Sequence, residues 1–166
     1  RLIWVWVFSI FYVVGAWALW WVAPGGGFDV LLWAVAFFGI GFIGMEFATI
    51  FTNALMPSLT QADDLGAISG SGFAFGYLGG LLALVIMLLF FAEGADSGLT
   101  LLGTQPLFGL DPEAREGTRF VGPFTALWFA VFMIPFFLWV KEPHTDRRPL
   151  HLGRAFASLK DLIRSL

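Results

Sequence analysis

Few side chains in this sequence can do acid–base or polar chemistry, and most of them lie in short polar segments between long apolar ones. The exception is Glu46, which stands inside an apolar run with Asn53 seven residues further on. A charge inside a membrane-spanning helix is unfavourable unless it is paired, hydrated or protonated. Two interpretations stay open. Glu46 and Asn53 form a functional polar site, or Glu46 lies near the headgroups, about 26 Å along the helix from Asp29, and pairs with a basic residue of a neighbouring helix.

The other acidic residues and the histidines predict no catalytic or metal site. Asp63 and Asp64 are adjacent, so they point in different directions on a helix, and with Thr60 they have the spacing of a helix-capping box. His144 and His151 lie in a polar tail without cysteine or close carboxylates. The chain has no cysteine at all, which excludes disulfides and thiol nucleophiles. We therefore expect no enzyme activity, no metal and no cofactor.

The composition excludes a soluble globular protein. Of the 166 residues 58% are hydrophobic and 13% are charged, with 20 Phe and 8 Trp. A chain with so little polar surface cannot cover itself in water. The sequence therefore predicts an integral membrane protein, with the lipid bilayer as its first partner and no nucleic acid among the others.

Four apolar segments are long enough to cross a hydrocarbon core of about 30 Å. They are residues 2–23, 29–56, 69–92 and 120–140. We expect Asp29 to cap the second helix, Pro57 to limit its end, and Pro112 to begin a helical turn in the loop of residues 93–119.

Apolar residues recur on one stripe of the tail, which predicts a C-terminal amphipathic helix on the cytoplasmic surface. The predicted fold is thus all-α, with a four-helix transmembrane segment over residues 1–143 and a cytoplasmic linker with the amphipathic helix over residues 144–166.

The third apolar segment carries a face without side-chain bulk. Gly72, Gly76 and Gly80 follow one another at intervals of four residues, with Ser69 and Ala83 beside them. Such small-residue faces let another helix approach closely in lipid. We call these five residues the glycine seam and predict that they pack against a helix.

The order of three motifs resembles the vacuole-effluxer-like branch of the major facilitator superfamily. These are NALMP at 53–57, SGSGFAFGYLGG at 69–80 and FFLWVKEP at 136–143. The resemblance implies helices three to six of a secondary transporter of small solutes, with amino-acid export the best-known role among its fungal relatives. Relatives usually carry arginines between the fourth and fifth helices, where residues 65–67 are Leu, Gly and Ala.

The leading hypothesis for function is therefore a fragment of a transporter that works by alternating access, with further helices as its partners. The first residue is Arg1 and the apolar run begins at the next, so we expect the chain to be an excerpt of a longer protein. The alternative is a non-transporting four-helix subunit that docks on a larger membrane complex.

The distribution of basic residues predicts the orientation in a bacterial inner membrane. With four spans, one side has Arg1, Lys141, Arg147, Arg148, Arg154, Lys160 and Arg164, while the other has only Arg115 and Arg119. Because basic residues are retained on the cytoplasmic side, both termini should be cytoplasmic.

This orientation can be tested by labelling single cysteines, since the chain has no native cysteine. In intact cells an impermeant thiol reagent should react with Ser97→Cys and not with Thr145→Cys. The reverse pattern would contradict the predicted orientation.

Overall fold

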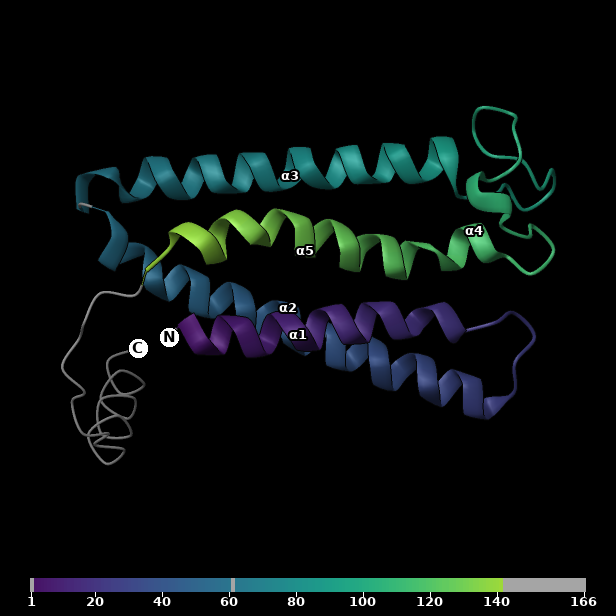
Figure 1. The fold of residues 1–166 in the computed structure, drawn as a ribbon, viewed down its shortest axis with the longest axis horizontal. Helices are drawn as coiled ribbons and strands as arrows, with labels where there is room; N and C mark the ends of the chain where they lie inside the picture. The colour runs from purple at the N-terminus through teal and green to yellow at the C-terminus, as the bar shows by residue number, and fades with distance from the viewer. Residues whose placement is uncertain (1, 61, 142–166) are drawn as a thin grey trace, which may run out of the picture.

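A computed structural model describes residues 2–60 and 62–141 of the chain, and this part contains helices and no strands. Four helical stretches are long and apolar enough to cross a membrane: Leu2–Trp21, Phe28–Leu59, Leu65–Phe90 and Glu116–Trp139. They alternate in direction (Figure 1). The chain is therefore an all-α integral membrane protein, as its composition predicted. The expected amphipathic helix at 144–166 lies outside the described residues.

The helices are α1 (Leu2–Ala18), continued by the 3-10 turn η1 (Leu19–Trp21), and then α2 (Phe28–Leu59). The short η2 (Ala62–Asp64) leads into α3 (Leu65–Phe90), and η3 (Leu107–Gly109) lies in the long loop that follows. The last span consists of α4 (Glu116–Arg119) and α5 (Val121–Trp139). We call the end with residues 19–27 and 91–120 the long-loop end, and the end with residues 60–64 the short-turn end.

The expected cap of α2 and its expected end at Pro57 are wrong. Gly27 precedes the helix and its carbonyl accepts the N–H groups of Val30 and Leu31, so Asp29 lies in the first turn and caps nothing. The helix also continues through Pro57 to Leu59. The helix can continue because Pro57, close to its end, removes only one backbone N–H donor.

The expected caps in the two later loops are also wrong. Thr60 has extended backbone angles after the end of α2, and Asp64 precedes α3 without a side-chain capping bond, so no capping box forms. Pro112 begins a turn, not a helical turn, because Arg115 adopts a left-handed conformation and α4 starts after it. Helix α3 begins four residues earlier than expected, at Leu65.

Glycines hold α1 and α2 together as an antiparallel pair. A Cβ atom added to Gly15 would lie 2.6 Å from the Cα of Gly41, and one added to Gly44 would lie 2.5 Å from the backbone nitrogen of Tyr12. Beside this contact the rings of Phe8 and Phe47 stack with centroids 4.8 Å apart. The two backbones therefore touch, and their register is fixed.

Helix α5 packs on α1 by the same principle, because a Cβ added to Gly122 would collide with the carbonyl oxygen of Ala16. Helix α3 lies on the outer side of α5 and away from α1 and α2 (Figure 1). Its buried residues, Ala83 and Met87, lie towards the long-loop end. The described chain is thus a three-helix body with α3 attached mainly at one end.

A substitution pair in α2 tests the backbone contact. Gly44→Ala should lower the free energy of unfolding by about 1–3 kcal/mol, since its Cβ has no room. Gly39→Ala is the control, because nothing lies within 4 Å of a Cβ there. It should be neutral or stabilise by up to about 1 kcal/mol through helix propensity. Equal effects in reversible unfolding in detergent would contradict the proposed contact.

Candidate functional site

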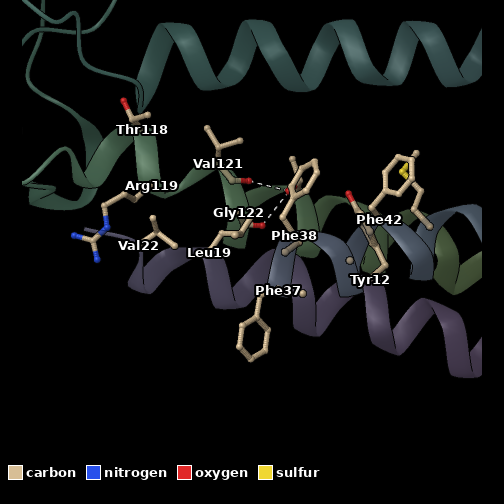
Figure 2. Close-up of a pocket in the computed structure, with 15 residues that line it drawn as sticks. Tyr12, Leu19, Val22, Phe37, Phe38, Phe42, Thr118, Arg119, Val121 and Gly122 are labelled. Atoms are coloured by element: carbon tan, nitrogen blue, oxygen red, sulfur yellow. Dashed lines mark hydrogen bonds between the residues drawn. The ribbon is translucent and has the colours of Figure 1, made fainter. Parts of the chain in front are cut away.

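A groove of about 530 Å³ lies where α1, α2 and the start of α5 meet (Figure 2). In this view Tyr12 and Phe42 lie towards one end, and Arg119 and Val22 lie towards the other. The volume is within the range of about 300–1,000 Å³ found for small-molecule sites. The lining residues are mostly apolar and come from all three helices: Tyr12, Gly15, Ala16, Leu19, Val22, Phe37, Phe38, Gly41, Phe42, Met45, Thr118, Arg119, Val121, Gly122 and Thr125.

The glycines that join the helices also shape this groove. Gly15, Gly41 and Gly122 line it without contributing side chains, so the walls are formed by aromatic rings such as Phe38 and Tyr12. The Tyr12 ring is held edge-on against Phe129, with centroids 4.6 Å apart. The arrangement can hold an apolar group against aromatic surfaces.

The polar groups of the groove are mostly engaged by the protein. The Thr125 hydroxyl donates to the carbonyl of Val121 (2.9 Å) or of Gly122 (3.0 Å), shown by the dashed lines in Figure 2. The Arg119 guanidinium donates from Nε (2.8 Å) and Nη2 to the backbone carbonyl of Trp20. Its central carbon lies 5.0 Å from the centroid of the Trp20 ring. Arg119 therefore closes one end of the groove and joins α4 to η1.

A second polar cluster, which we call the Glu93 cluster, joins the end of α3 to α4. The Glu93 carboxylate is fully buried and accepts the backbone N–H (3.0 Å) and the hydroxyl (2.7 Å) of Thr118. The Nε of Arg115 lies 3.2 Å from the same carboxylate, with the arginine side chain 37% exposed. Gly117 leaves the space, since a Cβ there would collide with the Phe91 carbonyl and with Glu93. The buried charge is thus paired and hydrogen-bonded.

Phenylalanine rings gather around Phe91, next to the Glu93 cluster. Phe91 is buried, and its ring lies 4.9 Å from Phe120, 5.6 Å from Phe108 and 5.9 Å from Phe124, measured between centroids. Burial of this kind excludes water and strengthens the enclosed polar contacts. Aromatic and polar contacts therefore both tie the end of α3 to the last span at the long-loop end.

The structure leaves most of the glycine seam uncovered. Gly72 and Gly76 are exposed, and nothing lies within 4 Å of a Cβ added at Gly72, Gly76 or Gly80. Ser69 is half-buried, and Ala83, at the end of the seam, is buried. The seam does not meet a helix of the described chain over its three glycines, so its packing partner stays a prediction.

Glu46 and Asn53 are both exposed and lie two turns apart on α2. The contact of Gly44 with Phe8 and Tyr12 places Glu46 level with the middle of the Leu2–Trp21 span. Glu46 therefore lies well away from both ends of this span. Among the described residues no ion pair of Glu46 occurs, and Asp63 and Asp64 are exposed at the short-turn end.

The sequence analysis did not predict the Glu93 cluster or the contact of Arg119 with Trp20. Glu93 and Thr118 are 25 residues apart, and Arg119 and Trp20 are 99 apart, so only the packing of the helices brings them together. The one local feature of the sequence that indicates a close contact here is Gly117, which lies between Arg115 and Arg119. Within the described ranges no group of three His, Cys, Asp or Glu residues has the geometry to hold a metal ion.

Comparison with protein-family models, with curated proteins and with solved structures found no match to this chain.

The Glu93 cluster can be tested by unfolding in detergent. Thr118→Val removes the hydroxyl donor and should lower the free energy of unfolding by about 1–3 kcal/mol, because it leaves a buried carboxylate oxygen without its partner. Glu93→Leu should lower it further, since both donors of Thr118 lose their acceptor. Asp96→Asn, at an exposed acid of the same loop, should have little effect. If Thr118→Val and Asp96→Asn behave alike, the cluster does not tie α3 to α4.

Proposed function

We propose that this chain is part of a secondary active transporter that moves small solutes, amino acids among them, across a membrane by alternating access. The resemblance of residues 53–57, 69–80 and 136–143 to the vacuole-effluxer-like branch of the major facilitator superfamily supports this proposal. A transporter of this kind needs two sets of helices that rock against each other around a central site.

The observation that carries the proposal is the exposed face of α3. This helix has 26 residues and no charged side chain, yet its glycines have no neighbour within 4 Å of an added Cβ. Helices in lipid gain little from burying apolar side chains, so a glycine face is useful only where another backbone comes close. We infer that a further helix of the same transporter packs there.

The orientation proposed from the basic residues gives the two ends different environments. The short-turn end would face the cytoplasm of a bacterial cell, because Lys141 and the basic tail follow the end of α5 there. The long-loop end, with the Glu93 cluster and Arg119, would face the outside. On this proposal the rings of Trp20 and Trp33 lie near the outer interface, where tryptophan is enriched.

Transport by the purified full-length protein in proteoliposomes tests the proposal. We expect exchange of radiolabelled amino acids across the membrane. Gly76→Ala should keep most of this activity, whereas Gly76→Leu should remove it and lower the yield of assembled protein, because a larger side chain separates the helices. Leu84→Ala, on an exposed part of the same helix, is the control and should assemble normally.

Two outcomes would contradict the proposal. Absence of exchange for any tested solute, together with stable association in a larger membrane complex, would favour the docking subunit. Equal, near-native assembly and exchange of Gly76→Ala and Gly76→Leu would mean that the seam faces lipid and that no further helix packs on it.

A further inference from the structure

The direction in which Glu46 points is fixed by the α1–α2 contact. The residues of α2 that are buried against the bundle are Gly41, Gly44, Ala48 and Leu55. At about 100° per residue, Glu46 lies roughly 160–220° around the helix from all four. The carboxylate is therefore on the side of α2 opposite to α1, and it is exposed there.

Other polar groups share this side of α2. Thr49 lies about 60° and Asn53 about 20° around the helix from Glu46, and both are exposed. The Thr49 hydroxyl donates to the carbonyl of Met45 and keeps its lone pairs available as acceptors. Because Pro57 has no N–H to donate to the backbone carbonyl of Asn53, that carbonyl is a further acceptor beside the Asn53 side chain. We call Glu46, Thr49 and Asn53 the Glu46 face.

The depth of this face makes its polarity informative. Glu46 is level with the middle of the Leu2–Trp21 span, and the other charged residues of the described spans, Asp29, Glu116 and Arg119, lie at the long-loop end. A carboxylate at this depth is strongly disfavoured against lipid and is found beside a partner or in a water-filled cavity. The polarity of the Glu46 face therefore favours contact with water or with a polar partner over contact with lipid.

The described part of the chain offers Glu46 no positive partner. Its basic residues are Arg115 and Arg119, which are engaged at the long-loop end, and Lys141, which follows α5 at the short-turn end. Beside Glu46, Gly39 lies two turns towards the long-loop end on the same side, and a Cβ added there would meet nothing within 4 Å. A carboxylate next to open space and two hydrogen-bonding side chains is suited to a hydrated cationic group.

We propose that the Glu46 face lines an aqueous pathway within the membrane and that the Glu46 carboxylate attracts the cationic group of a solute there. That the molecule carrying this cationic group is a transported solute rests on the proposed function. The presence of water along the face does not depend on that function and can be measured without transport.

Cysteine accessibility tests the aqueous pathway, because the chain has no native cysteine. Thr49→Cys and Asn53→Cys, each made in the full-length protein in proteoliposomes, should react with the cationic reagent MTSET at least tenfold faster than two controls. Ala54→Cys, exposed and adjacent to Asn53 but about 100° around the helix, should react slowly. Ala48→Cys, buried on the α1 side, should also react slowly. Equally slow reaction at all four positions would overturn the proposal.

The role of the carboxylate has its own readout. At Thr49→Cys the cationic reagent MTSET should react faster than the anionic reagent MTSES, relative to their rates with free cysteine. Glu46→Gln should reduce that preference by about three- to tenfold, as expected for one charge several ångströms away in a hydrated site. A preference that Glu46→Gln leaves unchanged would overturn the role of Glu46.

Failure of this proposal is distinguishable from failure of the transporter proposal. Labelling as predicted in a protein that exchanges no solute would support the aqueous face and refute transport. Exchange of solute without labelling of the Glu46 face would support transport and refute the aqueous pathway along this face. Folding of each variant is checked by its elution from a sizing column, and Thr49→Cys and Asn53→Cys serve as independent probes of the same face.

Discussion

The backbone contact between α1 and α2 determines the position of the other features of the molecule. Gly15, Gly41 and Gly44 let the two helices touch, and this contact fixes their register. The register sets the depth of Glu46, and the buried side of α2 sets the direction in which it points. The same glycines leave the space that becomes the aromatic groove. A larger side chain at these positions would therefore alter the groove and the Glu46 face together.

At the long-loop end polar contacts hold the helices in addition to the glycine contacts of Gly117 and Gly122. In lipid there is little hydrophobic gain from bringing apolar helices together, so close packing and hydrogen bonds must hold them. Arg119 joins α4 to Trp20, and Glu93 joins the end of α3 to Thr118. Because α3 has few other contacts in the described chain, the Glu93 cluster and the rings around Phe91 are its principal attachment.

The sequence predicted the membrane class and the four helices because apolar length is a local property. It failed at the ends of helices, where the backbone of Gly27 replaced the expected cap of Asp29 and where α2 continued through Pro57. It could not predict the Glu93 cluster, since contacts between residues 25 or 99 positions apart depend on how helices pack. It identified Glu46 as unusual from its surroundings, but the depth and direction of that side chain required the register of α2 against α1.

The glycine seam and the Glu46 face are both open in the described chain, but they require different surroundings. The seam has no side-chain atoms that could hydrogen-bond to water over Gly72, Gly76 and Gly80, so only a closely packed helix satisfies it. The Glu46 face has a carboxylate, a hydroxyl and an amide, which a dry apolar helix surface would leave unsatisfied. One apolar helix cannot cover both. The seam therefore indicates a contact within a helix bundle, whereas the Glu46 face indicates the side of that bundle that water reaches.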